Sequence, residues 1–517
     1  MSINKAAEEI LGKTTPSRYC GWFDQECQEI TERKNKAYAI MQQRKYTRSS
    51  VETYRVTRRE EKHLHKQKKQ KYENKLVKRL NEFGNQNQIR NFYKEINNVR
   101  KDFKPRLTLC KSSDGTIISD DNGILDRWQK YFHSLLYNEE QESQSGEDQE
   151  VNSEDDREAE PPTEEETELA VLKLKNNKSP GSDNLQAELF KMGGKMLIKQ
   201  LHKLMVLIWR TECIPEEWKL SIIYPIHKKG DPMECTNYRG VSLLNCAYKI
   251  FSNILFSRLS AYTDKIIGNY QCGFRKSRST IDQVFSLRQI LEKTREFGIV
   301  THHLFIDFKS AYDSVNRKEL FSAMKELNIP LKLIKLANQT MQNTKSQIKI
   351  QANLSGEINV NNGLRQGDAL ACLLFNIALE KVVRDAGIQT NGTIFYKSVQ
   401  ILVYADDIDI IARNRLALDE AFIALEKSAY KMGLKINQEK TKYMVSSPTQ
   451  ETFIKIGNYK FDVVENFTYL GSIVNKNNNN SEEIKKRIFI ANKCYYGLRK
   501  YLKSHLLCLN NKIKLYK

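Results

Sequence analysis

The hydrophobic pattern changes character along this chain of 517 residues. From the N-terminus to about residue 105, charged and amide side chains dominate, and apolar residues are too few for a broad buried face. This pattern predicts long helices that are mostly solvated. Only a partial stripe at helical spacing is present, formed by Trp22, Phe23, Ile30, Ala37 and Ile40.

A second pattern runs over residues 106–138, where the turn sequence SSDGTIISD precedes apolar residues at helical spacing. It predicts a short strand and turn, and then an amphipathic helix. We therefore expect residues 1–138 to form a basic helical N-terminal region. The apolar face of its last helix comprises Trp128, Tyr131, Phe132, Leu135 and Leu136.

Residues 139–167 interrupt the pattern, because they are acidic, contain Ser and Pro, and hold few apolar side chains. A segment that cannot bury apolar surface does not offset its chain entropy, so we expect a disordered linker here. Beyond it the pattern is that of a globular protein up to the C-terminus, without internal repeats.

The chain is strongly positive outside that linker. The formal net charge is +20, and residues 139–168 contain fifteen acidic residues and one Arg, so the −14 of this segment leaves +34 for the remainder. Such a surface favours a polyanionic partner such as nucleic acid, although a merely soluble basic protein has the same composition. The basic run from Arg58 to Arg79 either grips phosphates, serves as a nuclear address or is a solvated helical face.

The ten cysteines are scattered, without a CxxC pair or a Cys/His cluster at zinc spacing. That distribution is typical of a reducing compartment, where most thiols are buried apolar filler. The N-terminal sequence lacks an apolar signal core, and no apolar run is long enough to cross a membrane. We therefore expect an intracellular protein that is not secreted and contacts no membrane.

The candidate chemistry begins at residues 302–315, HHLFIDFKSAYDSV. The apolar run through Ile306 predicts a buried strand, and Asp307 stands at its end. A carboxylate in that position is costly unless a positive charge meets it. Helix capping is the plainer alternative, reasonable for Asp313 and weaker for Asp307.

Two apolar β-rich runs flank the sequence YADD within residues 398–413. They predict a hairpin that carries Asp406 and Asp407 at its turn. Adjacent carboxylates repel each other, and a divalent cation such as Mg²⁺, which prefers oxygen ligands, removes the repulsion. Two adjacent aspartates at a turn are common, so this segment alone does not establish a catalytic site.

The third segment is residues 361–383, NNGLRQGDALACLLFNIALEKVV. Gly363 and Gly367 precede a strongly apolar helix predicted over residues 369–383. Glycines ahead of a helix allow the backbone to approach a ligand, and the Gln366 amide can hydrogen-bond a sugar or a base edge. An ordinary loop before a core helix is the alternative.

In this order, a strand ending in Asp, a Gly-Gln-Gly loop with its helix, and an Asp-Asp hairpin resemble motifs A, B and C of the polymerase palm. Over about residues 165–500 the chain closely resembles the reverse transcriptases of non-LTR (LINE-type) retrotransposons, and most nearly their RTE-like branch. Further segments resemble the family's N-terminal extension, fingers, template-contacting segment, motif D and primer grip. They are KNNKSPGSDNLQAELFK (175–191), IPEEWKLSIIYPIHKKGDPMECTNYRGVSLLN (214–245), QCGFRKSRSTIDQ (271–283), MGLKINQEKTKYM (432–444) and FTYLGSIV (467–474).

The resemblance implies an α+β, right-hand polymerase fold with an antiparallel palm sheet. Fingers and palm would occupy residues 168–475, with the fingers at roughly 165–300, and residues 476–517 would begin a helical thumb. Relatives usually carry an endonuclease domain before the polymerase, and some carry a zinc knuckle after it. The sequence shows neither, so we expect a fragment that lacks the endonuclease domain and has a truncated thumb.

The implied activity is RNA-directed DNA polymerisation, in which a primer 3′-hydroxyl attacks the α-phosphate of a deoxynucleoside triphosphate. YADD in motif C, where viral RNA-copying polymerases have GDD, favours DNA synthesis. The resemblance assigns two Mg²⁺ ions, with Mn²⁺ as a substitute, to Asp307, the Phe308 carbonyl, Asp406 and Asp407. Two alternatives stay open, namely a catalytically silent element copy that only binds nucleic acid and an RNA-templated RNA polymerase.

The nucleotide contacts implied by the family fall on the fingers, motif A and motif B. Tyr312 occupies the position of the aromatic gate against a ribose 2′-hydroxyl, unless it is only a core aromatic. Either Lys440 or Lys442 of motif D would protonate the departing pyrophosphate, unless both simply face solvent. The dNTP-binding residues assigned by resemblance are Lys228, Lys229, Arg239, Tyr312, Gln366 and Gly367.

Template and primer contacts are implied for further segments, with a solvated basic loop as the alternative for the template segment. The expected partners are therefore an RNA template, a DNA primer or target and dNTPs, in a nuclear or cytoplasmic ribonucleoprotein. The residues assigned to template and primer are Arg275, Lys276, Arg278, Tyr404, Tyr469, Leu470 and Gly471.

Overall fold

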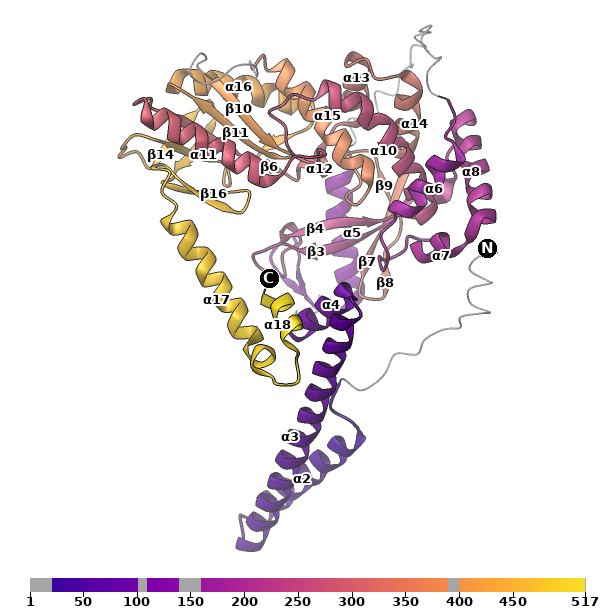
Figure 1. Ribbon diagram of the computed structural model, residues 1–517, viewed down its shortest axis with the longest axis vertical. Helices are drawn as coiled ribbons and strands as arrows, with labels where there is room; N and C mark the ends of the chain where they lie inside the picture. Colours follow the sequence, from indigo (N-terminus) through magenta and orange to yellow (C-terminus); the bar gives the residue numbers. More distant parts are fainter. Residues whose placement is uncertain (1–20, 101–108, 139–159, 389–398, 517) are drawn as a thin grey trace. The chain divides into compact units, whose positions relative to one another are not determined.

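The computed structural model describes residues 21–100, 109–138, 160–388 and 399–516. The chain forms two compact units. One combines Met1–Pro105 with Ile484–Lys517, and the other is Arg106–Glu483. Helices and strands carry the labels of Figure 1.

The unit formed by the two ends of the chain is helical, so the long helices predicted for the basic N-terminal region are confirmed. Its helices are α2 (Gln25–Gln43), α3 (Arg48–Asn85), α4 (Ile89–Arg100), α18 (Leu509–Tyr516) and most of α17 (Ser481–Lys503). Apolar residues from both ends share one core, which comprises Leu76, Val77, Leu80, Phe92, Ile96, Leu498, Tyr501 and Leu507.

A polar contact joins α18 to α3 beside this core. Asn511 is buried, and its Nδ2 donates to Oδ1 of Asn81 at 3.2 Å, while the same oxygen accepts the backbone N–H of Cys508 at 3.0 Å. A side chain at Gly84 would overlap the Asn511 amide. Residues 484–517, expected at the start of a thumb, therefore pack with the N-terminal helices in one unit.

The larger unit is built around a six-stranded sheet in the order β10-β11-β5-β13-β15-β14. Neighbouring strands are antiparallel except β13 and β15, so the predicted antiparallel palm sheet is confirmed around its central strands. The strands are β5 (His302–Ile306), β10 (Val399–Tyr404), β11 (Asp407–Ala412), β13 (Lys442–Val445), β14 (Phe453–Ile456) and β15 (Tyr459–Val463).

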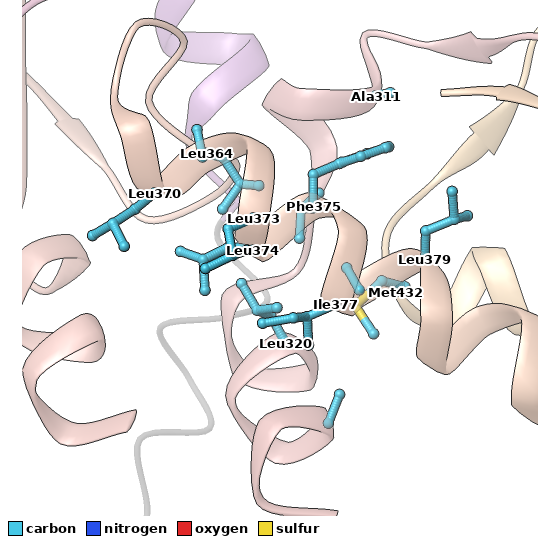
Figure 2. Close-up of a cluster of buried hydrophobic side chains, with 14 of the residues drawn as sticks. Ala311, Leu320, Leu364, Leu370, Leu373, Leu374, Phe375, Ile377, Leu379 and Met432 are labelled. Carbon is cyan, nitrogen blue, oxygen red and sulfur yellow. The ribbon is translucent and has the colours of Figure 1, made fainter. Parts of the chain in front are cut away.

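One face of this palm sheet packs against α15 (Ala369–Asp385) and α16 (Arg415–Lys431). The helix predicted after the Gly-Gln-Gly loop is confirmed as α15, and Asp368 caps it by accepting a backbone N–H of the first turn at 3.2 Å. Most of α15 is buried, as its apolar sequence requires. Figure 2 shows its side chains meeting Leu320 and Met432 in this core.

The opposite face of the palm sheet packs against α11 (Thr280–Glu296) and the hairpin of β16 (Asn466–Tyr469) and β17 (Ser472–Asn475). Phe305 lies in this interface, with its ring stacked on that of Phe467 at a centroid distance of 4.2 Å. Because both faces are covered (Figure 1), the central strands have the near-continuous apolar sequence of buried strands.

A second sheet forms the fingers, in the order β4-β3-β7-β8, with β9 paired to β7. β3 and β4 form an antiparallel hairpin, and β7 joins β3 in parallel. Three strands of this sheet thus lie beyond the predicted fingers at roughly 165–300. The strands are β3 (Leu220–His227), β4 (Tyr238–Leu243), β7 (Thr344–Ile350), β8 (Asn353–Leu354) and β9 (Ile358–Val360).

The helix α5 (Asp121–Leu136) packs on this fingers sheet. The Trp128 ring meets Tyr238 of β4 edge-on at a centroid distance of 4.9 Å. The predicted strand, turn and helix of this segment are confirmed as β1, β2 and α5. The predicted end of the N-terminal region at residue 138 differs from the structural division, which follows Pro105, because the apolar face of α5 is buried by the fingers.

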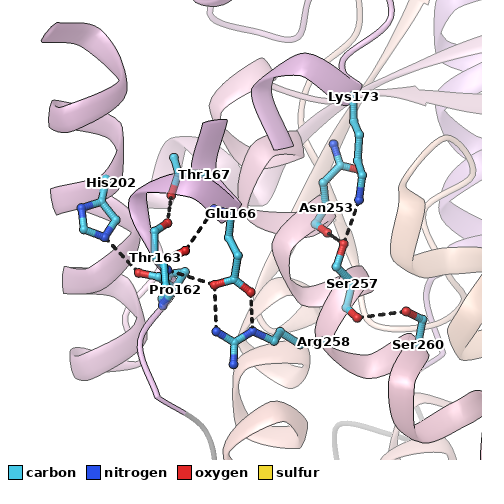
Figure 3. Close-up of polar contacts among 10 residues, drawn as sticks. All are labelled: Pro162, Thr163, Glu166, Thr167, Lys173, His202, Asn253, Ser257, Arg258 and Ser260. Atoms are coloured by element: carbon cyan, nitrogen blue, oxygen red, sulfur yellow. Dashed lines mark hydrogen bonds and ion pairs between the residues drawn. The ribbon is translucent and has the colours of Figure 1, made fainter. Parts of the chain in front are cut away.

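The acidic stretch ends in a helix. Residues 139–159 lie outside the described residues, but α6 (Glu164–Lys173) begins inside the predicted linker, so the prediction of disorder is wrong from residue 164 onward. Thr163 and Glu166 form a capping box, and Arg258 donates to both oxygens of Glu166 at 2.7 and 2.8 Å (Figure 3). Acidic side chains stabilise the first turn of a helix, so their density here favours a helix.

The remaining elements of the larger unit complete these layers. In the part of the chain that the structure describes, no helix is long and apolar enough to cross a membrane, and the described cysteines are free thiols. These remaining elements are β1 (Cys110–Lys111), β2 (Ile117–Ile118), α7 (Ala187–Met192), α8 (Gly194–Thr211), α9 (Glu216–Lys219), the 3-10 helix η3 (Cys235–Asn237), α10 (Cys246–Ile266), β6 (Phe308–Lys309), α12 (Ala311–Ser314), α13 (Arg317–Glu326), α14 (Leu331–Met341) and β12 (Lys435–Ile436).

Candidate active site

Asp307, the first candidate carboxylate, follows directly on β5. The register pairs Ile306 with Ile408 of β11, so the next position, Asp307, stands beside Asp407. Because side chains two residues apart share a face of a strand, both carboxylates lie on the sheet face that carries Phe305. Two segments separated by a hundred residues of chain thus bring their carboxylates together.

The predicted hairpin of motif C is confirmed, since β10 and β11 pair up to Tyr404 and Asp407. Ala405 and Asp406 form the turn, and Ala405 has a φ of +56°. A two-residue hairpin turn needs a positive φ to match the twist of its strands, and a residue other than glycine is strained there. This turn places Asp406 immediately before Asp407.

Residues 270–273, ahead of α11, hold this turn in place. The backbone N–H of Cys272 donates to the Val403 carbonyl at 2.9 Å, and Oε1 of the buried Gln271 accepts the Ala405 N–H at 3.0 Å. A Cβ on Gly273 would overlap the Ala405 backbone. The sequence does not single out Gln271, because a single amide beside a motif carries no periodic signal.

The electrostatics at the turn are those of crowded carboxylates. Burial raises the pKa of Asp407 to about 6, and the charges of Asp406 and Asp307 add to the rise. The pKa of Asp406 is also raised, by burial and by Asp307, although Arg239 and Lys228 oppose the shift. The neighbouring acids therefore disfavour the ionised forms of Asp406 and Asp407.

Asp307 itself is bound by the motif D segment. Its Oδ2 lies 3.3 Å from Nζ of Lys440 and accepts a hydrogen bond from Nδ2 of Asn437 at 3.0 Å. The backbone N–H of Asn437 also donates to the Asp307 carbonyl, at 2.8 Å. Lys442 instead lies in β13 and pairs with Asp462 at 2.5 Å. Of the two candidate lysines, Lys440 is the one at the carboxylates.

These carboxylates have the donor chemistry of a divalent-cation site. Oxygen is the ligand that Mg²⁺ prefers, and a cation among the carboxylates would remove the repulsion that raises the pKa of Asp406 and of Asp407. Within the described residues, no three or more His, Cys, Asp or Glu side chains are grouped to hold a metal ion as they stand. The Asp307 carboxylate contacts Lys440 instead. Phe308, whose carbonyl is a further predicted ligand, lies next to it in β6.

Two of the predicted triphosphate-binding cations face these carboxylates from the fingers hairpin. Arg239 lies near the start of β4, and Lys228 directly follows β3. The pKa of Lys228 is lowered by burial and by the charges of Arg239 and Lys440, whereas the charges of Asp406 and Asp307 raise it. Lys229, the next residue of the hairpin loop, is exposed.

Tyr312 lies in α12, against the motif B helix. Its ring stacks on Phe375 of α15, with centroids 4.5 Å apart and planes 21° apart, and Phe274 meets it edge-on at 6.4 Å. Phe274 is exposed and has a φ of +56°, a strained conformation of the kind found at functional sites. The sequence places Phe274 within the template segment but does not indicate this contact.

Backbone hydrogen bonds join the motif B loop to motif A and to the fingers. The Leu364 N–H donates to the Tyr312 carbonyl at 2.7 Å, and the Ser242 N–H of β4 donates to the Gln366 carbonyl at 2.7 Å. Gly367 has a φ of +118°, and a Cβ there would lie 2.9 Å from the Ser242 carbonyl oxygen. Glycine therefore allows the fingers strand to approach this loop.

Arg317 also holds the motif B loop in place. Its buried guanidinium donates to the carbonyls of Gly363 at 2.8 Å and Val360 at 3.1 Å, and to the Thr344 hydroxyl at 3.1 Å. Burial lowers the pKa of Arg317 to about 9. Nothing in the sequence alone distinguishes Arg317 from a surface cation, because its partners are neutral oxygens of segments farther along the chain.

The Gln366 side chain meets a second carboxylate of motif A. Its Nε2 lies 3.0 Å from both carboxylate oxygens of Asp313. The capping role considered for Asp313 is wrong, because Asp313 lies inside α12 and the neighbouring helix α13 is capped by Asn316. Motif A therefore supplies an additional acid to the wall of this site.

The three basic residues of the template segment differ in their surroundings. The Arg275 side chain is only 12% exposed and donates to the carbonyls of Gly268 at 2.9 Å and Gln271 at 3.2 Å, so it organises its own loop. Lys276 and Arg278 are exposed on that loop, and Arg278 donates to Oδ1 of Asn269 at 3.3 Å.

The predicted primer residues lie at and beside the turn between β16 and β17. Tyr469 is buried in the core under α11, with its ring centroid 5.7 Å from that of Phe305. Leu470 and Gly471 form the turn, with φ values of +47° and +86°, and Gly471 is exposed. Tyr404 is half-buried at the end of β10, beside the acidic turn.

The comparisons with known proteins concern this site directly. Residues 226–474 match the family model described as reverse transcriptase (RNA-dependent DNA polymerase). That span contains the palm carboxylates, the end of β3 with all of β4, and the motif B loop. The chain is similar to the transposon TX1 uncharacterized 149 kDa protein of Xenopus laevis, at 24% identity over 69% of this chain and 28% of that protein. Over these residues the chain is similar to reverse transcriptases, and its relatives include transposon proteins.

The chain is also similar to the probable RNA-directed DNA polymerase from transposon BS of Drosophila melanogaster, at 26% identity over 54% of this chain and 31% of that protein. The chain thus spans less than a third of the length of these curated relatives. A telomerase structure from Candida tropicalis matches 54% of the chain at 14% identity, with a TM-score of 0.36. The larger unit has the right-hand polymerase fold, with its palm and fingers sheets as described.

Proposed function

We propose that this reverse transcriptase domain extends a primer 3′-hydroxyl with deoxynucleoside triphosphates on an RNA template. One observation carries the proposal. Asp307 and Asp407 stand side by side, Asp406 adjoins them in the turn, and the charge of Lys228 in the fingers interacts with those of Asp307 and Asp406. The description of the matching family, RNA-dependent DNA polymerase, supports this activity.

Asp307, Asp406, Asp407 and the Phe308 carbonyl would hold two Mg²⁺ ions, with Mn²⁺ as a substitute. When bound, these ions lower the pKa of the attacking hydroxyl and balance the charge of the triphosphate. The chain itself would hold these ligands in position. The hydrogen-bonded pairing of β5 and β11 sets the distance between Asp307 and Asp407, and the strained turn places Asp406 beside them.

The nucleotide would lie between the palm carboxylates and the fingers cations. The planar guanidinium of Arg239 would bind the triphosphate with two hydrogen bonds, and the ammonium of Lys228 would bind it as a point charge. Lys229 would add a further positive charge from the loop between β3 and β4. Tyr312 would exclude a ribose 2′-hydroxyl, since its ring is held against Phe375 and does not swing aside without losing that contact. Gln366 and Gly367 would line the sugar side of the site.

Lys440 is proposed as the proton donor to the departing pyrophosphate. Its side chain is half exposed and lies 3.3 Å from the Asp307 carboxylate, so it stands at the edge of the site with freedom to move. An ammonium group in that position can act as a general acid. Lys442 is held by Asp462 in the sheet and is assigned no catalytic part.

The template backbone would contact Lys276 and Arg278, while Arg275 keeps their loop in shape. Leu470 and Gly471 would support the primer end, with Tyr469 as their buried anchor and Tyr404 beside the primer terminus. The partners are an RNA template and a DNA primer or target, and their binding is salt-sensitive because the contacts are to phosphates. We assign the domain to an RTE-like element that acts in a nuclear or cytoplasmic ribonucleoprotein.

Primer extension on poly(rA) annealed to oligo(dT) tests this function. We expect extension with dTTP, little with UTP, and loss of extension in the Asp307→Asn variant. Preferential use of UTP would make the protein an RNA polymerase. Binding of the template–primer without extension by either nucleotide would make it a silent element copy, and either result overturns the proposal.

A further inference from the structure

The outer side of α16 carries a stripe of large apolar side chains. The inner side of this helix packs on one face of the palm sheet (Figure 1). On the outer side, Leu416, Ile423 and Tyr430 are 69%, 50% and 66% exposed. They stand seven residues apart, and seven residues complete almost two helical turns, so the three side chains line one face. Single exposed apolar residues are common, but an aligned set is typical of a helix that packs on a partner.

Two charged residues flank this stripe on one side. Glu420 precedes Ile423 by three residues and Lys427 follows it by four, so at about 100° per residue both point to the same side of the stripe. Both are exposed, and neither forms an ion pair within the part of the chain that the structure describes. A carboxylate and an ammonium group are thus available to a partner beside the apolar stripe.

The acids on the other side of the stripe have partners within the chain. Asp419 accepts a hydrogen bond from Nε of Arg415 at 2.6 Å, and Glu426 accepts one from the Tyr459 hydroxyl at 3.0 Å. Both acids are only partly exposed. A partner helix would therefore find free charges on the Glu420 side of the stripe.

The pattern along this face is self-complementary. Leu416 and Tyr430 stand seven residues on either side of Ile423, and the two charged residues stand three and four residues from it. An antiparallel helix pair with a two-fold axis at Ile423 therefore brings Leu416 against the partner's Tyr430. It also brings Glu420 against the partner's Lys427, and the symmetry repeats each contact. In a parallel pair these two charges lie on opposite edges of the contact and do not meet.

We propose that this outer face of α16 binds a second copy of the chain, as an antiparallel helix pair with two-fold symmetry. One copy supplies both halves of every contact, which an unrelated protein would have to match separately. A single pair of helices buries less than the roughly 1,600 Å² of a standard interface, so the dimer is weak and depends on protein concentration. The inference does not depend on the proposed function.

Dimerisation through α16 leaves the candidate active site accessible. The helix covers one face of the palm sheet, whereas Asp307 and Asp407 lie on the other face, which carries Phe305. The stripe contains none of the residues assigned to metal, nucleotide, template or primer. The oligomeric state can therefore be measured separately from activity.

Sedimentation velocity of the full chain, freed of nucleic acid, tests the proposal over about 1 to 100 µM. The wild type should change from monomer to dimer in this range without larger species, because a two-fold interface closes at two copies. Ile423→Glu places a carboxylate against its own copy at the two-fold axis and should raise the dissociation constant of the dimer by about tenfold or more. Met196→Glu is the matched control, since Met196 is an exposed apolar residue of another helix, α8, and should leave the dissociation constant unchanged.

Exchanging the charges tests the antiparallel arrangement. At low salt, Glu420→Lys and Lys427→Glu alone each bring like charges together twice, and each should raise the dissociation constant by about tenfold. The double variant exchanges the two charges and should return to within about threefold of wild type. A wild type that stays monomeric throughout, a dimer that Ile423→Glu leaves intact, or single charge variants that the double variant does not rescue would each overturn the inference. If Ile423→Glu fails to fold, the charge variants decide.

Discussion

The palm contains one acid that accepts several hydrogen bonds, Asp368, and a cluster of three acids that repel one another. Asp368 is buried, and Tyr248, Ser252 and the first turn of α15 all donate hydrogen bonds to it. Asp406 and Asp407 adjoin each other and Asp307, and their pKa values are raised by burial and by this mutual repulsion. One acid is matched by donors within the fold, whereas the cluster is left with charge that the fold does not balance.

This difference in hydrogen bonding distinguishes an acid that stabilises the fold from acids that form a binding site. An acid that accepts several hydrogen bonds stabilises the helix that it caps, while crowded acids lower stability and persist where a ligand uses them. Two cations show the same contrast. Arg317 donates to neutral oxygens of the chain, whereas Lys228 faces the carboxylates across an open site.

Removing one acid of the cluster should have the largest effect. Asp406→Asn and Asp307→Asn should each lower turnover by about a thousandfold or more, because a metal-centred electrostatic contribution is lost. In metal-free buffer Asp406→Asn should keep or raise the unfolding midpoint, since a repelling charge is gone. Single-turnover primer extension and urea denaturation measure the two effects. Retention of more than a tenth of wild-type turnover would remove Asp307 and Asp406 from the metal site.

Removing the matched acid should act on stability instead. Asp368→Ala leaves the buried hydroxyls of Tyr248 and Ser252 without their acceptor, so the free energy of unfolding should fall by about 3 kcal/mol. The control is Asp126→Ala, which removes an exposed ion pair with Lys130 and should cost about 0.5 kcal/mol or less. Equal losses in the two variants would show that Asp368 is not part of the scaffold.

The two motif D lysines differ in the same way, since Lys440 lies at the acidic cluster and Lys442 is paired within the sheet, and a smaller effect is expected. Lys440→Ala should lower turnover by about a hundredfold, as expected for a lost general acid, and Lys442→Ala should stay within about threefold of wild type. Single-turnover rates at saturating dTTP distinguish them. The reverse ranking would show that the ion pair between Lys442 and Asp462 breaks during the reaction.

Tyr312→Val should narrow the preference for dTTP over UTP by about tenfold, because the ring that would meet a 2′-hydroxyl is gone. Tyr312→Phe is the control, since it keeps the ring against Phe375 and should keep the preference. The measurement is kcat/KM for each nucleotide. An unchanged preference in the valine variant would make Tyr312 a core aromatic alone.

The smallest effects concern the template segment. Lys276→Ala and Arg278→Ala should each reduce the salt dependence of template–primer binding by about one unit in the slope of log K against log salt. Arg275→Ala should lower the melting temperature and leave that slope nearly unchanged, because its guanidinium binds carbonyls of its own loop. If only Arg275→Ala changed the slope, then Arg275, and not Lys276 or Arg278, would be the residue that contacts the template.

Several features of the site follow from short stretches of sequence. The apolar run before Asp307 encodes a buried strand, the alternation around YADD encodes a hairpin, and the apolar face after Gly367 encodes α15. The structure has all three. These signals are local, because strand and helix periods and turn residues act over a few positions along the chain.

Long-range contacts decided the rest. The sequence does not indicate that Gln271 holds the acidic turn, that Asp313 binds Gln366, or that β7 joins the fingers sheet. It also left Lys440 and Lys442 equivalent, and the structure separates them by their partners.

By itself, then, the sequence determined which elements form and which carboxylates they carry. Only the tertiary structure decided which polar groups are matched and which are left for a ligand. The physical reason is that a hydrogen bond or an ion pair depends on the distance between two side chains in space. For residues far apart along the chain, that distance is set by how strands and helices pack, and it leaves no periodic mark in the sequence.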